Sequence, residues 1–316
     1  MNFQHLHGLI AAPFTPLNSK GEINPSIIPT YYQLLKTNGV KGAFICGSTG
    51  EGVSLTKEEK MTIAEAWANA TNKDPDFRVM TLLGGTCIAD CKVLAKHAES
   101  IGLYGVSFTS PSYFKPSNAK ILASMCAEIA AEVPKMPFYY YHIPVLTGAS
   151  VDMIDLLGEV DEMIPNFAGI KYTHEDFMDF LSCMNFKNNK YDMLWGRDEN
   201  MLSALVLGAK GAVGSTFNYF TPLYHQLIAA FDANDLKTAV ALQQKSIDFI
   251  RLLGKYGGIA TGKAYMKLVG IDCGEFRLPV KNMDAAQFIL FKNDVANLGF
   301  SKFKSINPAD KSLITV

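Results

Sequence analysis

Residues 136–172 read MPFYYYHIPVLTGASVDMIDLLGEVDEMIPNFAGIKY. Two short runs rich in aromatic or β-branched residues, 136–142 and 167–172, flank a longer segment of helical period, as in one strand–helix–strand unit. The same alternation continues along the chain without a linker. It predicts strands at 7–15, 42–47, 78–84, 105–110, 136–142, 167–172, 191–196 and 211–215. Eight strand–helix units predict an α/β fold, a closed (β/α)8 TIM barrel.

Helix signals support this division of the chain. Asn24 before Pro25 offers an N-cap and a first-turn proline, and residues 56–59 have the spacing of a capping box. Segments with helical period and almost no strand character follow the eighth strand, at 222–232, 234–255, 261–269 and 284–297. We therefore expect a barrel over residues 1–222 and an extension of extra C-terminal helices, residues 223–316, packed on it.

An open, doubly wound sheet is the main alternative architecture. Its nucleotide-binding form requires G-x-G-x-x-G after the first strand. Here that turn reads Phe14-Thr15-Pro16-Leu17, so the sequence favours the closed barrel.

The composition excludes several classes of protein. The 316 residues are 48% hydrophobic and 19% charged, which suits a large core, and the net charge of −1 without a basic stripe indicates neither nucleic-acid nor membrane binding. No signal peptide and no membrane-spanning run is apparent, so we expect a soluble, cytoplasmic protein. The six cysteines are scattered along a long chain and are expected to be reduced and mostly buried.

A lysine ends the sixth predicted strand. Residues 167–173 read FAGIKYT, so Lys171 ends an apolar strand and its ammonium group is expected to point into the barrel mouth, the end that carries active sites in such barrels. An ion pair with a barrel carboxylate, or an amine extended to solvent, is the ordinary explanation. The alternative is a nucleophile that condenses with a carbonyl group, which requires desolvation or a positive neighbour to lower the lysine pKa.

Three consecutive tyrosines occupy the fifth predicted strand. Period-two alternation places Tyr139 and Tyr141 on the face opposite Tyr140, with Tyr141 nearer the mouth. Such runs usually only pack in a core. A phenol beside a lysine, however, is able to carry protons to and from an alcohol oxygen, as an aldol cleavage requires.

Polar loops follow three other predicted strands. Residues 47–52 read GSTGEG, a turn whose amides and hydroxyls suit a carboxylate, although glycine-rich turns are also common without a ligand. Residues 196–199 read GRDE and residues 214–216 read GST, groups that suit a polyhydroxylated substrate. Asp198 and Glu199 have a simpler explanation as acidic residues in the first turn of the next helix.

Metal catalysis is the competing route to carbon–carbon cleavage, but the strand ends offer no cluster of ligands. Cys87 and Cys91 lie four residues apart on a predicted helix without a nearby His or carboxylate set. His142 and His174 follow different strands. We therefore expect no catalytic metal.

Taken together, these motifs resemble a known family. Residues 47–51 (GSTGE), Tyr141 followed by Ile143-Pro144, and residues 169–171 (GIK) resemble the dihydrodipicolinate synthase and N-acetylneuraminate lyase superfamily of class I pyruvate aldolases. They occur in the expected order, at the ends of strands two, five and six. The resemblance spans nearly the whole chain, including the extra C-terminal helices. Each motif is weak alone, whereas the ordered set is specific.

The resemblance implies roles for particular residues. Lys171 forms an imine with C2 of a 2-keto acid, Tyr141 is the general acid and base, and Ser48 and Thr49 hold the carboxylate. Tyr113 matches a tyrosine that a neighbouring subunit often inserts into the active site, so an oligomer is implied, by family habit a homotetramer. Neither a metal nor an organic cofactor is implied.

Within the superfamily, the chain resembles the lyase branch. The synthase branch usually has an arginine two residues before the glycine of the strand-five loop, where this chain has Leu146-Thr147-Gly148. Arg197 departs from the lyase pattern and leaves the acyl-group preference open. The lyase branch implies contacts to the hydroxylated tail and acyl-amino sugar portion from Thr173, Gly196, Asp198, Glu199 and Ser215.

The implied reaction is reversible, Schiff-base-dependent cleavage of N-acetylneuraminate (sialic acid) to pyruvate and N-acetylmannosamine. Two alternatives stay open. One is another class I 2-keto acid aldolase or a dihydrodipicolinate synthase-like enzyme on the same fold. The other is a catalytically silent sugar-binding barrel, against which the presence of both Lys171 and Tyr141 argues.

Overall fold

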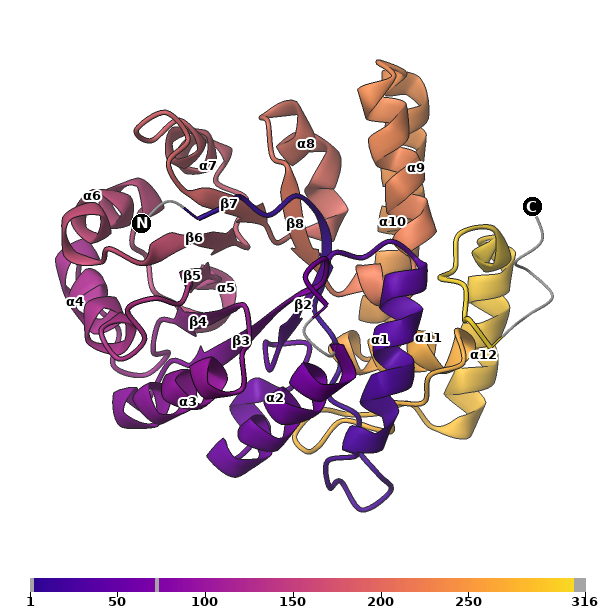
Figure 1. The fold of residues 1–316 in the computed structure, drawn as a ribbon. Coiled ribbons are helices and arrows are strands. Elements are labelled where there is room, and N and C mark those ends of the chain that lie inside the picture. The colour runs from indigo at the N-terminus through magenta and orange to yellow at the C-terminus, as the bar shows by residue number, and fades with distance from the viewer. Residues whose placement is uncertain (1–2, 72–73, 310–316) are drawn as a thin grey trace.

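The computed structural model describes residues 3–71 and 74–309. Within them, a parallel sheet closes into a barrel whose strands follow one another in chain order (Figure 1). The strands are β1 (Gly8–Ala11), β2 (Gly42–Ile45), β3 (Arg78–Gly84), β4 (Gly105–Thr109), β5 (Phe138–His142), β6 (Phe167–Tyr172), β7 (Asp192–Trp195) and β8 (Gly211–Gly214). All eight predicted strands and the (β/α)8 barrel are confirmed.

Helices follow the strands and cover the outside of the barrel. Those between strands are α1 (Ile28–Thr37), α2 (Lys57–Thr71), α3 (Ile88–Ser100), α4 (Ala119–Ala130), α5 (Pro144–Thr147), α6 (Met153–Met163), α7 (Phe177–Met184) and α8 (Met201–Val206). The four helices predicted after the last strand are present as α9 (Thr221–Asp232), α10 (Leu236–Lys255), α11 (Thr261–Leu268) and α12 (Ala285–Asn297).

The pairing of the first strand with the last excludes the open-sheet alternative. β1 lies beside β8, with Ala11 opposite Gly214. In a doubly wound sheet these strands would not pair with each other. β1 ends four residues earlier than the predicted strand 7–15, because Pro13 has no amide hydrogen with which to continue the ladder.

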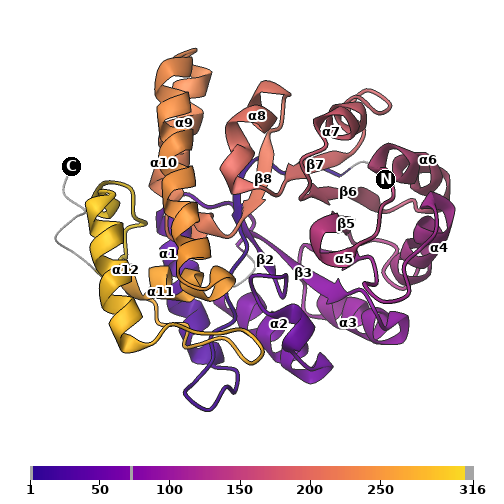
Figure 2. The same ribbon diagram turned by 180° about the vertical axis from the view of Figure 1, so that it is seen from behind.

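The last four helices gather on one side of the barrel. Figures 1 and 2 show α9 to α12 beside α1 and α8 and away from α3 to α7. Buried side chains from this region, such as Phe249 of α10 and Phe291 of α12, belong to the same apolar cluster as the outer face of the barrel. The barrel and these helices therefore share a core.

One of the two predicted helix signals is confirmed only in part, because Pro25 lies in the first turn and Asn24 precedes it without capping it. Asn24 makes no capping bond; its side-chain oxygen instead accepts a hydrogen bond from Ser26 Oγ at 2.6 Å, and a 3-10 turn, η1 (Pro25–Ile27), precedes α1. A serine hydroxyl two residues away competes with the backbone for such an oxygen. The capping box is confirmed, because Thr56 and Glu59 exchange side-chain-to-amide bonds of 3.1 and 2.9 Å.

The two faces of the sheet carry two separate apolar clusters. The larger one lies between strands and helices and contains Tyr140. Tyr139 and Tyr141 point inward, so the predicted alternation of the three tyrosines is confirmed. The interior cluster consists of Ile10, Ala12, Phe44, Met80, Leu82, Tyr139, Tyr141, Ile143, Ala168, Leu194 and Val213.

An irregularity in β6 decides which way its lysine points. The β5–β6 register shifts between Phe138 and Tyr139, which leaves Ala168 of β6 without a partner residue on β5. Strict alternation from the outward-facing Phe167 would place Lys171 on the outer face. The extra residue reverses the side of every residue beyond it, so Lys171 faces the barrel interior.

The cysteines behave as expected from their scatter. All six are free thiols, and all are buried except Cys87. Across the described ranges, none of the helices combines the length and the apolar character that a membrane span needs.

Candidate active site

Lys171 places its amine inside the barrel near the mouth. The residue is only 4% exposed, and Nζ lies 4.1 Å from the ring centre of Phe44 and 4.0 Å from that of Tyr141. Among the residues that the structure describes, no carboxylate lies within ion-pair distance of this amine; the charge of Asp198 reaches it only from farther away. Neither an ion pair nor a solvated amine therefore accounts for this lysine.

Burial changes the proton affinity of Lys171. Removal from water disfavours the charged form and lowers the pKa to about 7. The negative charge of Asp198 raises the pKa and is the smaller effect. A large fraction of the amine is therefore neutral near pH 7, and the neutral form is the nucleophile.

Tyr141 is the neighbour of Lys171 on β5. The two residues are paired across the β5–β6 ladder, and Tyr141 Oη lies 3.5 Å from Ser48 Oγ. Burial raises the pKa of the Tyr141 phenol, and the neighbouring hydroxyl groups of Ser48 and Thr173 partly oppose this rise. The phenol is therefore protonated near neutral pH and has hydroxyl groups on two sides.

The turn after β2 brings small polar groups to the same region. Thr49 is buried and Ser48 is half-buried. Thr15 Oγ1 donates a hydrogen bond of 2.6 Å to the Gly50 carbonyl oxygen and so ties the turn to the segment after β1. Within the part of the chain described, the Thr49 and Gly50 amides donate to no other group. These amides and hydroxyls are the donors that a carboxylate requires.

Gly196, directly after β7, packs closely against Thr173. A Cβ atom on Gly196 would lie 1.9 Å from Thr173 Oγ1, so only glycine fits this approach. The Gly196 amide donates to the Tyr172 carbonyl oxygen at 2.8 Å. The close packing sets the Thr173 hydroxyl beside the cavity and beside Tyr141.

Asp198 is a buried carboxylate at the mouth. Its Oδ2 accepts hydrogen bonds from the Thr216 amide at 2.8 Å and from Thr216 Oγ1 at 2.6 Å. Burial raises the Asp198 pKa to about 7. The carboxylate therefore joins the loop after β7 to η4 (Thr216–Asn218), whereas the simpler explanation assigned it to the start of its own helix, η3 (Asp198–Asn200).

Arg197 connects the loops after β6 and β7. Its Nη2 atom lies 2.8 Å from Glu199 Oε1 and 2.6 Å from Glu175 Oε1. Trp195 Nε1 donates to the Arg197 carbonyl oxygen at 2.6 Å. Glu199 is thereby held at the rim by the arginine. Sequence reasoning missed Glu175, because its contact with Arg197 depends on how two loops meet in space.

One cavity of about 270 Å³ collects these groups at the barrel mouth. Thr216, from the polar loop predicted after the last strand, also lines the cavity, whereas Ile250 and Leu253 of α10 were missed from the sequence. The helical period predicted α10 but does not say which of its residues reach the strand ends. The predicted residues that line the cavity are Thr49, Tyr141, Lys171, Thr173, Gly196, Asp198, Glu199 and Ser215.

Two predicted site residues do not line this cavity: Ser48, whose Oγ lies 3.5 Å from Tyr141 Oη, and Tyr113, which lies apart from the site. Tyr113 is 83% exposed, and its ring packs edge-on against Phe114 at 4.9 Å between centres. Its entry into the site of a neighbouring subunit concerns an assembly, and therefore stays a prediction.

Two histidines lie together beside the strand ends. The rings of His142 and His174 are 5.5 Å apart, and burial lowers the His142 pKa to about 3. The His142 ring also packs against Tyr172 at 5.0 Å. In residues 3–71 and 74–309, no three His, Cys, Asp or Glu side chains are grouped as metal ligands would be.

Relatives of known function extend over nearly the whole chain. An N-acetylneuraminate lyase from Mus musculus is 41% identical over 280 residues, 87% of each chain. The N-acetylneuraminate lyase from Homo sapiens is 41% identical over 282 residues, again 87% of each chain. Among solved structures, the N-acetylneuraminate lyase from Proteus mirabilis superposes with a TM-score of 0.91 at 37% identity, covering 94% of this chain and 100% of that one.

Comparison of this chain with sequence models of protein families leads to the same group of proteins. The model described as the Dihydrodipicolinate synthetase family matches residues 5–296. A dihydrodipicolinate synthase from Bacillus anthracis, at 24% identity and a TM-score of 0.85 over 92% of this chain and 97% of that one, shares the fold. The resemblance inferred from the ordered motifs is confirmed, and this chain belongs to the dihydrodipicolinate synthetase family.

Proposed function

We propose that this protein is an N-acetylneuraminate lyase, a class I aldolase that cleaves N-acetylneuraminate reversibly to pyruvate and N-acetylmannosamine. The observation that carries the proposal is the buried amine of Lys171, with a pKa lowered to about 7, against the face of Tyr141 in the mouth cavity. The N-acetylneuraminate lyases that are 41% identical to this chain support the choice of substrate.

The first stage joins the enzyme to the substrate. The neutral amine of Lys171 attacks C2 of open-chain N-acetylneuraminate, and the carbonyl oxygen leaves as water, which yields a protonated imine. Ser48 and Thr49 hold the substrate carboxylate so that C2 stays within reach of the amine, an orientation effect. The imine is the electron sink of the next stage, so the scheme requires no cofactor.

The second stage breaks the carbon–carbon bond. Tyr141 gives its phenol proton to the oxygen that leaves as water in the first stage, which makes it a phenolate. The phenolate then accepts the proton of the C4 hydroxyl, the C3–C4 electron pair moves toward the imine, and N-acetylmannosamine leaves with an enamine remaining on Lys171. The enamine takes a proton at C3, and water then hydrolyses the imine to release pyruvate and the free lysine. A phenol flanked by Ser48 and Thr173 is placed for this proton transfer.

The rest of the cavity suits the polar tail of the sugar. We assign contacts with the hydroxylated tail and acyl-amino group to Thr173, Gly196, Asp198, Glu199 and Ser215, which line the same cavity as Lys171. Arg197 acts on this region through its ion pair with Glu199. Its influence on acyl-group preference is measured by comparing N-acetyl and N-glycolyl substrates.

We also propose the assembly and location of the enzyme. The barrel comprises residues 1–222 and carries residues 223–316 as a helical extension, and the protein is a cytoplasmic homotetramer. Exposed aromatic rings at Tyr113 and Phe114 suit a subunit contact, through which Tyr113 enters a neighbouring site. Sedimentation equilibrium tests the tetramer, and a monomeric active enzyme would contradict the role of Tyr113.

A substrate comparison tests the proposed reaction against its alternatives. We expect pyruvate release from N-acetylneuraminate, followed with lactate dehydrogenase, to exceed release from 2-keto-3-deoxy-gluconate and to exceed condensation of pyruvate with aspartate semialdehyde. Leu146 occupies the position of the synthase arginine, so the semialdehyde carboxylate lacks that partner. Preference for either alternative substrate would reassign the enzyme within its family, and no reaction or imine at all would favour the silent barrel.

The rate is expected to fall as the pH drops through 7. Burial holds the Lys171 pKa at about 7, so the neutral, nucleophilic fraction decreases about tenfold from pH 8 to pH 6. Asp198, with a pKa raised to about 7, titrates in the same range and belongs to the same apparent transition. The measurement is kcat/KM for N-acetylneuraminate from pH 5.5 to 9. A flat profile between pH 6 and 8 would contradict a Lys171 nucleophile with a lowered pKa.

A further inference from the structure

A buried ion pair joins the C-terminal helices to the turn after β2. Lys263 of α11 and Glu51 of the turn have side chains that are 2% and 4% exposed, and Lys263 Nζ lies 2.7 Å from Glu51 Oε1. The other oxygen, Oε2, accepts from the Arg277 amide at 3.1 Å. Lys263 Nζ also donates to the Glu275 carbonyl oxygen at 3.1 Å. Both oxygens of the Glu51 carboxylate are thus bound by the C-terminal part of the chain.

The backbone at Glu51 needs such a partner. Its φ of 57° and ψ of 25° lie in the left-handed region, which residues other than glycine rarely adopt. Cys46, at the start of the same turn, also has a positive φ of 56°. Gly52 is packed so closely that a Cβ atom there would lie 1.8 Å from the Cys46 carbonyl oxygen. Conformations of this kind persist where surrounding contacts hold them, and Lys263 supplies the charged contact.

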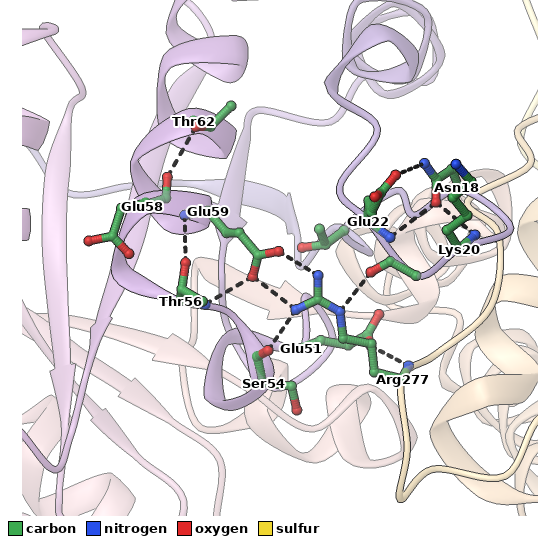
Figure 3. Close-up of polar contacts among 12 residues, drawn as sticks. Asn18, Lys20, Glu22, Glu51, Ser54, Thr56, Glu58, Glu59, Thr62 and Arg277 are labelled. Carbon is green, nitrogen blue, oxygen red and sulfur yellow. Dashed lines mark hydrogen bonds and ion pairs between the residues drawn. The ribbon is translucent and has the colours of Figure 1, made fainter.

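Stability alone does not explain this pair. Desolvation of two buried charges offsets most of their attraction, so apolar replacements of such pairs are often neutral or stabilising. A second ion pair already joins the same two regions nearer the surface, where the Arg277 guanidinium donates to both carboxylate oxygens of Glu59 and to the Ser54 carbonyl oxygen (Figure 3). The buried pair is better explained by a role in orienting the turn after β2.

We propose that Lys263 is a positioning residue for the substrate carboxylate: by holding Glu51, it fixes the turn that presents Thr49 to the cavity and Ser48 to Tyr141. The inference rests on the carboxylate-binding role proposed above for those two residues. The Glu51 amide donates to the Ser48 carbonyl oxygen at 3.2 Å, so a rotation at Glu51 displaces the residues between them. Lys263 itself does not line the cavity.

The test compares a charged and an uncharged keto compound. In the double variant Glu51→Gln/Lys263→Met no unpaired charge stays buried. We expect the pyruvate concentration that gives half-maximal borohydride trapping on Lys171 to rise about tenfold or more, because donors to the carboxylate are displaced. For methyl pyruvate, which lacks the negative charge, we expect a change of less than about twofold. The readout is the ratio of the half-maximal pyruvate concentration to the half-maximal methyl pyruvate concentration. A general loss of structure raises both concentrations and leaves this ratio unchanged.

Glu59→Gln is the matched control. It breaks the neighbouring ion pair with Arg277 and leaves Lys263 and Glu51 in place, so we expect a lower unfolding temperature and an unchanged ratio. A folded double variant that keeps the wild-type ratio, or that weakens both compounds equally, overturns the proposal.

Two further outcomes are also decisive. If the double variant does not fold, Glu51→Asp keeps both charges and shortens the reach by one methylene group. The ratio of the pyruvate to the methyl pyruvate concentration should then rise by less than in the double variant, and an unchanged ratio overturns the proposal. If the wild-type protein forms no imine with pyruvate while remaining folded, the proposed function fails, and this inference fails with it. If the wild-type protein forms the imine and the variants keep the wild-type ratio, the proposed function stands and only the role of Lys263 is rejected.

Discussion

Lys171→Ala is expected to lower kcat/KM for N-acetylneuraminate by at least about 10⁴-fold. Lys171 is the lysine of the cavity lining, and Arg197, the other cationic residue there, is too basic to supply a neutral nucleophile. Without an imine there is no electron sink to accept the C3–C4 electron pair. The measurement is pyruvate release, together with trapping by pyruvate and borohydride and location of the mass gain by peptide mass spectrometry. The adduct should lie on Lys171 in the wild type and be absent from the variant.

Lys171→Met separates loss of chemistry from loss of structure. Because burial lowers the Lys171 pKa to about 7, the unfolded state binds more protons than the folded state from below pH 7 up to the pKa of a free lysine. This linkage destabilises the wild type most at and below pH 7. We therefore expect the Met variant to unfold at a higher temperature at pH 7, with a difference that shrinks toward pH 10. A folded variant that still releases pyruvate at the wild-type rate would contradict the Schiff-base mechanism.

Tyr141→Phe is expected to lower kcat by about 10²- to 10⁴-fold, the range typical of losing a positioned acid–base group. The change removes one oxygen and keeps the ring 4.0 Å from Lys171 Nζ, so the environment that lowers the lysine pKa is retained. Pyruvate should still be trapped on Lys171, since the nucleophilic amine is unchanged and water is able to supply the proton for loss of the carbonyl oxygen. Steady-state cleavage and borohydride trapping, measured on the same preparation, distinguish the two steps.

Tyr140→Phe is the control for this variant. Tyr140 is the adjacent residue, yet it packs on the outer face of β5 and lies outside the cavity. We expect it to leave kcat within about twofold of wild type. Equal losses in the two variants would show that the strand, rather than the Tyr141 hydroxyl, limits the rate.

Much of the fold was predictable from short-range patterns. The alternation of apolar runs with helical period located all eight strands and the four helices after β8, because each pattern reflects burial of one face of a local element. The ordered motifs around Ser48, Tyr141 and Lys171 identified the family, and eight of the predicted site residues line the cavity. Asn24 makes no capping bond because its side-chain oxygen accepts a hydrogen bond from Ser26 instead. The sequence does not show which of these two local hydrogen bonds is more favourable.

The direction of Lys171 was decided by the tertiary structure. The sequence places this lysine near a strand end, but strict alternation from Phe167 would turn it outward. The extra residue at Ala168 appears only when β6 is paired with β5, because a bulge is a property of two strands.

The sequence by itself thus determined the order of elements, the closed barrel that this order implies, and the chemical groups at the strand ends. The tertiary structure decided which of those groups meet. Arg197 with Glu175, and Lys263 with Glu51, come from separate loops and helices, the second pair 212 residues apart. The physical reason is that periodicity records the burial of local faces, whereas contacts between distant segments depend on strand register, barrel closure and helix packing, to which the whole chain contributes.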